Sequence, residues 1–241
     1  MTPIITDILV VNLPKCTARR LHIEKLFSRT GVEKYQFFPA VVPGTNKYEH
    51  MLQRFEVVSF PPCWQCHEDV CGCENKELTT TQIANWFTYI SLMEHIVSNY
   101  DEELIMICED DIQFQENGIK ILNRLLTLDS FQRASINVHN PLLIRCGSLY
   151  SNFHRMKCDP KIWKNKAYGR KPLANPCFII NKRFAEIFLD NLHRIEVTSD
   201  GYIHVKLVKI DSSIQHYTLL PQPIYELSRT NNPEFVSTIK Y

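Results

Sequence analysis

The stretch ELIMICEDDIQF, residues 103–114, decides the fold of this chain. It contains a short apolar run, LIMIC, which ends in three consecutive carboxylates. A continuous apolar run of this length is typical of a strand buried on both faces of a sheet. Three charges cannot stay buried without partners, so the strand is expected to bring Glu109, Asp110 and Asp111 to an edge of that sheet.

The placement of the three acids favours a metal site. Ligands of open α/β sheets lie at the carboxyl ends of the strands, which is where these side chains are expected. Carboxylate oxygens are hard ligands that suit Mn²⁺ or Mg²⁺. We therefore predict a divalent metal bound by Asp111, Asp110 and Glu109. The alternative interpretation is a polar turn after the strand, with its acids solvated.

Length, charge and hydropathy narrow the class of protein. The chain has 241 residues, enough for one domain or for a domain with an appendage, and its formal net charge is +1. So small a charge gives no reason to expect a nucleic-acid partner. No apolar run reaches the ~18 residues of a transmembrane helix. The N-terminal segment resembles a first strand rather than a signal peptide, so we expect a cytoplasmic protein with mostly reduced cysteines.

Four cysteines form a dense local cluster, here called the cysteine cluster. Cys63, Cys66, Cys71 and Cys73 follow the spacing C-x2-C-x4-C-x-C. Four thiols this close together can surround one tetrahedral Zn²⁺, and we predict a structural zinc in a small insertion at about residues 61–77. Two disulfides, or four unliganded thiols, remain as alternatives.

The order of the other segments is that of an α/β protein. A β-prone run at residues 4–11 is followed by a helical pattern at 17–28, with Arg19 and Arg20 in its first turns. These arginines are either ordinary surface side chains or phosphate ligands. A capping box at residues 79–82 begins a second helix, whose aromatic stripe is expected to be core.

Two later segments are candidates for function. Residues 152–172 form either a solvated loop or a loop that closes over an anionic ligand. They include Trp163 and Tyr168 among the basic residues Lys157, Lys161, Lys164, Lys166, Arg170 and Lys171. Asp200 lies between the helical pattern 182–192 and the run 202–208. Further strands are predicted at residues 35–42, 55–60, 135–148, 175–180 and 216–221, and a short helix at 118–128.

Taken together, these segments resemble glycosyltransferase family 25, which includes bacterial lipooligosaccharide and collagen galactosyltransferases. The matching pieces span most of the chain in the family's order. They are VNL at residues 11–13 with Lys15, Arg19 and Arg20, then FPAV at 38–41 with Gly44, LTTTQIA at 78–84, CEDD at 108–111, FIIN at 178–181 with Ala185 and Glu186, and Asp200. The family's Ser-His pair appears as Thr88-Tyr89, its usual acid before the arginines is Ala18, and the cysteine cluster lies outside its pattern.

The resemblance implies a GT-A-like fold, a mixed and mostly parallel sheet flanked by helices, as a single domain over residues 1–241. It also implies inverting transfer of a hexose, such as galactose or glucose, from a nucleotide sugar, usually UDP-linked, to a hydroxyl of a glycan or glycoprotein. Asn12, Arg19 and Arg20 would bind the donor, and Asp111 would be the direct metal ligand. Asp200 would be the base, with capping of the following segment as its alternative role.

Two other functions agree with the same residues. One is a non-catalytic module that binds a nucleotide sugar or a metal and acts through a protein partner. The other is metal-dependent phosphoester hydrolysis, which needs more metal ligands than one Glu-Asp-Asp run supplies.

Overall fold

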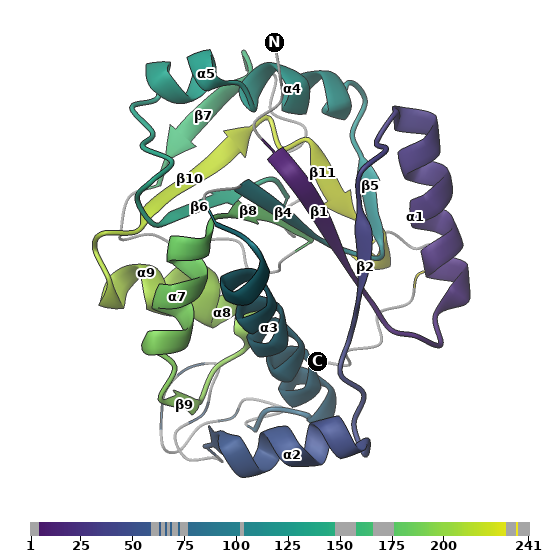
Figure 1. The fold of residues 1–241 in the computed structure, drawn as a ribbon, viewed down its shortest axis with the longest axis vertical. Coiled ribbons are helices and arrows are strands. Elements are labelled where there is room, and N and C mark those ends of the chain that lie inside the picture. The colour runs from purple at the N-terminus through teal and green to yellow at the C-terminus, as the bar shows by residue number, and fades with distance from the viewer. Residues whose placement is uncertain are drawn as a thin grey trace.

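The computed structural model describes residues 5–58, 63, 66, 68, 72, 77–101, 104–147, 158–165, 176–229 and 235. Its centre is a seven-stranded sheet (Figure 1). The strands, in spatial order, are β2 (Gln36–Pro39), β1 (Ile5–Asn12), β4 (Leu104–Glu109), β8 (Cys177–Ile180), β6 (Leu142–Arg145), β10 (Gln215–Leu220) and β7 (Lys161–Lys164). Only β8 and β7 run against the other strands of this sheet. The predicted α/β class and mixed, mostly parallel sheet are confirmed.

Two smaller sheets are attached to this frame. One pairs β5 (Ile112–Phe114) with β11 (Ile224–Glu226) in antiparallel register. The other pairs β3 (Glu56–Val57) with β9 (Arg194–Ile195) in parallel register. The first matters for function, because it joins the C-terminal part of the chain to the residues that follow β4.

Helices cover both faces of the main sheet. They are α1 (Thr17–Thr30), α2 (Asn46–Arg54), α3 (Thr80–Asn99), α4 (Gly118–Leu125), α5 (Leu128–Arg133) and α7 (Lys182–Asp190). Three consecutive short helices, α8 (Ser199–Gly201), η1 (Tyr202–Lys206) and α9 (Leu207–Ile210), form what is here called the helical run. A short helix, η2 (Leu227–Arg229), follows β11. One face packs against α2, α3, α7 and the helical run, and the other against α1, α4 and α5.

The central strand β4 is buried on both faces, as its unbroken apolar run predicts. Ile105 and Ile107 belong to the core under α3, while Leu104 and Met106 belong to the core under α1 and α4. All four side chains are at most 4% exposed. A strand held in this way is a rigid support for the acids that follow it.

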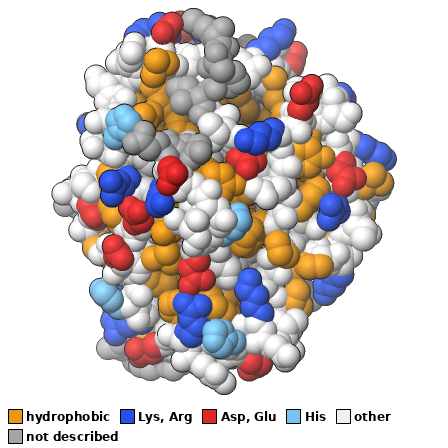
Figure 2. All heavy atoms as spheres, in the orientation of Figure 1, with side chains coloured by type: hydrophobic (Ala, Val, Ile, Leu, Met, Phe, Trp, Pro, Cys, Tyr) orange, Lys and Arg blue, Asp and Glu red, His pale blue; other side chains and the backbone are white. Residues whose placement is uncertain are grey.

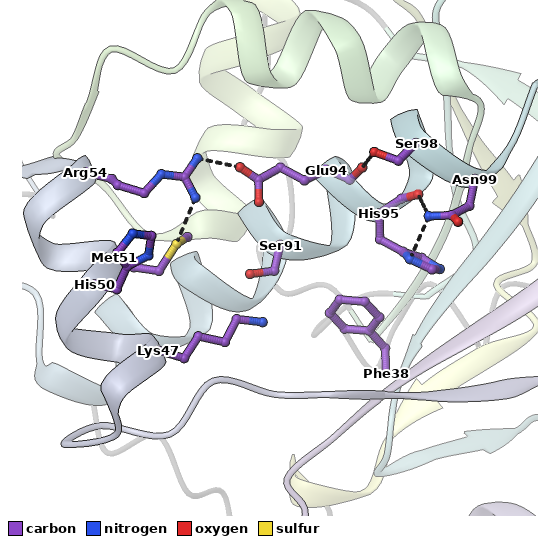
Figure 3. Close-up of a pocket in the computed structure, with 10 residues that line it drawn as sticks. All are labelled: Phe38, Lys47, His50, Met51, Arg54, Ser91, Glu94, His95, Ser98 and Asn99. Carbon is purple, nitrogen blue, oxygen red and sulfur yellow. Dashed lines mark hydrogen bonds and ion pairs between the residues drawn. The ribbon is translucent and has the colours of Figure 1, made fainter.

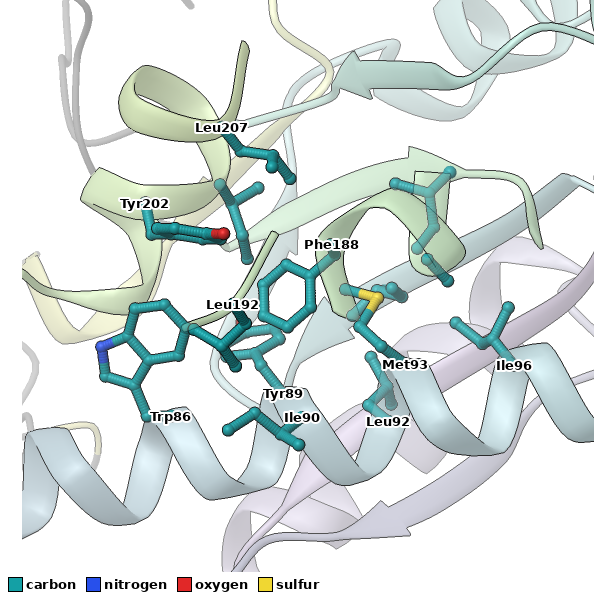
Figure 4. Close-up of a cluster of buried hydrophobic side chains, with 14 of the residues drawn as sticks. Trp86, Tyr89, Ile90, Leu92, Met93, Ile96, Phe188, Leu192, Tyr202 and Leu207 are labelled. Atoms are coloured by element: carbon teal, nitrogen blue, oxygen red, sulfur yellow. The ribbon is translucent and has the colours of Figure 1, made fainter. Parts of the chain in front are cut away.

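Helix α3 fills the first core with its aromatic stripe (Figure 4). Trp86 and Tyr89 pack beside Phe188 and Tyr202, and all four are buried. The predicted capping box is present, because Thr79 Oγ1 accepts from the Gln82 amide and Gln82 Oε1 accepts from the Thr79 amide. The stripe is therefore core, as predicted.

Several boundaries differ from the sequence prediction. The polar segment after Gly44 folds as α2, because Thr45 caps it and it buries Tyr48 and Met51. The helix expected at 118–128 is interrupted, since Thr127 caps a new helix, α5. The strand expected at 55–60 contributes only β3, and positions 59 and 60 lie outside the described residues.

Two predicted modules fall largely outside the described part of the chain. Cys63 is buried and Cys66 is exposed, whereas Cys71 and Cys73 lie outside it, so the zinc site stays a prediction. Of the basic segment 152–172, positions 158–165 are described and contain β7, which pairs with β10.

The described surface matches the balanced composition. Acidic and basic side chains are interspersed on the face drawn in Figure 2, among the atoms coloured there. Within the described residues, no helix has the length and apolar content that a membrane span requires.

Candidate active site

The three acids after β4 lie where β1, β4 and β6 all end. These strands run in the same direction, so their carboxyl ends meet at one edge of the sheet. Asn12 ends β1, Glu109 ends β4 and Arg145 ends β6. The apolar interiors of the strands hold this edge in place, and the polar side chains at it form the candidate site.

Asp110 is held by two groups from the first α/β unit. Asn12 Nδ2 donates to Asp110 Oδ2 at 2.7 Å, and an Arg19 guanidinium nitrogen donates to Asp110 Oδ1 at 2.9 Å. Asn12 and Asp110 are each 5% exposed. Arg20 is engaged elsewhere, since it pairs with Glu24 at 3.2 Å and lies 4.3 Å from the ring centre of Phe37. The structure thus brings Asn12 and Arg19 to the acids.

Asp111 has a charge that the fold only partly compensates. Its side chain is buried, and its Oδ2 lies 3.5 Å from an Arg19 nitrogen. Its Oδ1 has no hydrogen-bond partner among the described residues. Burial and then the nearby charge of Glu226 raise the pKa of Asp111 to about 7, although Arg19 lowers it. A buried carboxylate with an unpaired oxygen is a group that a cation would satisfy.

Arg19 serves the two aspartates together. Burial alone would lower the pKa of its guanidinium, but the charges of Asp111 and Asp110 outweigh burial and raise it. Arg19 therefore stays cationic and partly balances two carboxylates.

Glu109 turns toward the other face of the sheet, where α3 lies. Tyr89 donates from its hydroxyl to Glu109 Oε1 at 3.4 Å. Burial, followed by the charge of Asp111, raises the pKa of Glu109 well above its ordinary value. Since Glu109 points away from Asp110 and Asp111, which both face Arg19, the three acids do not form a ready-made cage. Among the described residues, no group of three or more His, Cys, Asp or Glu side chains could hold a metal by itself.

A fourth acid, Glu226, reaches the site from the C-terminal part of the chain. It ends β11, opposite Ile112, and is 8% exposed. The Leu227 amide donates to the Asp111 carbonyl at 2.7 Å, which fixes the two segments together. The sequence analysis missed Glu226, because nothing in its local sequence marks it as part of the site. Only the long-range pairing of β5 and β11 brings it there.

Asp200 lies in the first turn of the helical run that begins with α8. Two bonds from α3 hold the segment before it: Trp86 Nε1 donates to the Val197 carbonyl at 2.6 Å, and Ser199 Oγ donates to Asn85 Oδ1 at 3.3 Å. Its charge contributes to the raised pKa of Glu109. The predicted capping role is not observed, because Thr198 is the N-cap residue of α8 and Asp200 lies inside its first turn. Its role as a base stays a prediction.

Arg145 is a second residue that the sequence analysis missed. It is 2% exposed and extends from β6 on the face of the sheet that α3 covers. Its strand partners are Phe178 of β8 on one side and Thr218 of β10 on the other. Burial lowers the pKa of Arg145 to about 10, and the charge of Asp200 opposes this change. Arg145 is therefore a buried cation beside the candidate base. Its signal in the sequence was one basic residue at the end of an apolar strand.

The donor set fits a hard divalent cation. The carboxylates of Asp111 and Asp110 supply oxygen ligands, and the unpaired buried Oδ1 of Asp111 is a free position. Mg²⁺ and Mn²⁺ are commonly held by one or two carboxylates together with substrate phosphates and water. The edge of the sheet can thus accept such an ion without a complete cage of protein ligands.

Comparisons with known proteins agree with the resemblance seen in the sequence. The family model of glycosyltransferase family 25, described as an LPS biosynthesis protein, matches residues 5–203. No curated protein sequence matches significantly.

Two solved structures show weak similarity. A glycosyltransferase involved in glycosylation of the major capsid of PBCV-1 has 10% identity and a TM-score of 0.42, with 95% of this chain and 94% of that chain covered. The inositol-1-phosphate CTP transferase of T. maritima has 12% identity and a TM-score of 0.38, with coverage of 99% and 94%. Both scores are low, so the assignment rests on the sequence match.

Proposed function

Because the chain belongs to glycosyltransferase family 25, it is a glycosyltransferase, and we propose that it transfers a hexose from a nucleotide sugar with inversion. The donor is UDP-linked and the acceptor is a hydroxyl of a glycan or glycoprotein. One observation carries this proposal: the edge of the sheet gathers Asp110 and Asp111 at Arg19, and the charge of Glu226 acts on Asp111. So concentrated a negative charge suits a cation and the diphosphate that the cation accompanies.

The leaving group of such a reaction is a nucleoside diphosphate, on which negative charge grows as the glycosidic bond breaks. Asp111 would hold a Mn²⁺ or Mg²⁺ ion, with Asp110 beside it, and the bound ion would stabilise that charge. Asp110 is already fixed by Asn12 and Arg19, so its orientation needs no change when the donor arrives. This preorganisation avoids a cost at the moment of reaction.

Arg19 contributes to donor binding from the other side of the acids. Its guanidinium has five N–H donors in a planar fork, a geometry that suits phosphate oxygens as well as carboxylates. The side chain is 13% exposed, so a ligand at the edge of the sheet can reach it. The same charge that partly neutralises the acids can thus bind the diphosphate.

An inverting transfer also needs a base for the acceptor hydroxyl, and Asp200 is our choice. The hydrogen bonds of Trp86 and Ser199 to neighbouring groups position its segment. The buried cation Arg145 interacts electrostatically with Asp200. Asp200 would therefore remove the acceptor proton as the sugar leaves the diphosphate.

The direct test measures release of nucleoside diphosphate from a panel of nucleotide sugars, with and without Mn²⁺ and with a set of glycan acceptors. Release that needs Mn²⁺ and accelerates with an acceptor is the expected result. Turnover that is unchanged by chelation of divalent metals would contradict the metal-dependent mechanism. Binding of a nucleotide sugar without any turnover would favour the non-catalytic module instead.

A further inference from the structure

A hollow of about 410 Å³ lies between α2, α3 and the end of β2 (Figure 3). Helix α2 contributes Lys47 and His50, helix α3 contributes Ser91 and His95, and strand β2 contributes Phe38. Nothing in the proposed mechanism uses this hollow. Eight of its ten lining residues are polar or charged, and four of these are lysine, arginine or histidine.

The positive charge of the hollow is not cancelled by its one acid. Glu94 pairs with Arg54 at 2.7 Å and is thereby neutralised. Lys47 and His50 are exposed, and neither makes a hydrogen bond or ion pair with another described residue. A ligand with a negative group would therefore meet two unengaged basic side chains from one helix.

The opposite side of the hollow offers groups that suit a sugar ring. The Phe38 ring is half-buried, and its centroid lies 5.6 Å from that of His95. The Asn99 amide donates to His95 Nδ1 at 3.1 Å, so the hydrogen of the neutral ring is on Nε2, which can donate to a ligand. The Ser91 hydroxyl also faces the hollow (Figure 3). An apolar face beside several hydrogen-bonding groups is the usual composition of a small-molecule site.

The register of the sheet places the hollow near the candidate active site but apart from its two aspartates. Phe38 pairs with Val11 on β1, and Val11 pairs with Glu109 on β4. Two strand spacings separate Phe38 from Glu109, about 10 Å. These three side chains lie on the face that α3 covers, whereas Asp110 and Asp111 contact Arg19 of α1. The hollow is therefore too far from the acids to hold the reacting sugar, and within reach of a longer acceptor.

We propose that this hollow binds a negatively charged sugar unit of the acceptor, with its phosphate or carboxylate against Lys47 and His50 and its ring against Phe38. The proposal rests on the proposed function, because it assumes an acceptor of more than one unit. The site would fix the acceptor at a distance from the reacting hydroxyl. Binding energy from such a remote unit helps to orient the reacting group.

Binding of small probes tests the hollow without donor or metal. Glucose 6-phosphate, glucuronate, neutral glucose and UMP are titrated into the full chain, and the imidazole NMR signals of His50 and His95 are followed. The two anionic sugars are expected to shift these signals, with affinity that falls as salt increases, whereas glucose is not. In the double variant Lys47→Gln, His50→Gln, affinity for glucose 6-phosphate falls about tenfold or more. Lys120→Gln on α4, across the sheet, leaves it unchanged and is the matched control.

Three outcomes would overturn the assignment. The double variant could bind glucose 6-phosphate as tightly as the wild type, the anionic sugars could fail to bind at all, or UMP could bind the hollow more tightly than either sugar. The last outcome would identify a nucleotide site. Hydrolysis of the donor by water is measured on the same proteins. This hydrolysis needs no acceptor, so it tests the proposed function separately from sugar binding in the hollow. If hydrolysis is retained and no sugar binds, only the assignment of the hollow is overturned.

Discussion

Replacement of Asp111 by asparagine should make the metal-free protein relatively more stable as the pH rises. Asp111 has a pKa of about 7 in the fold, against an ordinary 3.8. Between these values the folded state binds a proton that the unfolded state has lost, so the wild type loses stability as pH increases. The stability that the raised pKa of Asp111 contributes is fully present below pH 3.8 and is lost as the pH rises through about 7. Asparagine has no proton to lose.

The magnitude follows from the pKa. Each pH unit in this window is worth about 1.4 kcal/mol, so the stability difference between Asp111→Asn and the wild type should grow by about 2–3 kcal/mol between about pH 5 and about pH 8. The lost contact to Arg19 adds an offset, but the pH-dependent change between the two proteins survives any constant offset. Denaturant unfolding in a chelating buffer at the two pH values measures it directly.

The matched control is Asp190→Asn, an exposed carboxylate at the end of α7. The stability difference between Asp190→Asn and the wild type should not grow as the pH rises. Added Mn²⁺ should stabilise the wild type at the higher pH and leave Asp111→Asn nearly unaffected. Sugar transfer by Asp111→Asn should fall on the order of 100-fold or more. A stability difference that does not grow with pH, or equal stabilisation of both proteins by Mn²⁺, would refute the reasoning.

Three further predictions concern separate parts of the chain. Asp200→Asn should lower the transfer rate by about 100-fold or more while donor affinity, measured by calorimetry, stays unchanged; unchanged transfer would exclude the base role. Arg19→Gln should weaken binding of the nucleotide sugar about tenfold and raise the pKa of Asp111 further in metal-free protein; an unaltered dissociation constant would contradict its donor role. Purified protein should contain one zinc per chain at the cysteine cluster; zinc-free protein with disulfides among these thiols would contradict that site.

The parts of the fold that the sequence predicted are those with a strong local pattern. The run LIMIC predicted a strand buried on both faces, and the capping box at Thr79 predicted the start of α3. Helix α2 was missed because its buried face rests on only Tyr48 and Met51 within a polar segment. Short strands such as β9 were missed because two residues carry no periodic pattern.

The candidate site likewise contains residues that the sequence predicted and residues that it did not. The acids Glu109 to Asp111 are adjacent in sequence, so their grouping was visible at once. The roles of Arg19 and Arg20 were not, because both lie in the first turns of one helix and only the packing of α1 decides which reaches the acids. The sequence analysis missed Arg145 and Glu226, since each enters the site through strand pairing with a distant segment.

The pairing of β5 with β11 has a consequence for the timing of assembly. Glu226 and Asp111 meet across roughly a hundred residues of chain, so the loop between them must close before they can interact. During synthesis the earlier acids emerge long before their C-terminal partner, and β10, which lies inside the main sheet, also comes late. A nascent chain cannot complete this edge until the segment that contains Glu226 has left the ribosome. Premature termination would therefore leave a chain that contains the Glu-Asp-Asp sequence but no finished centre.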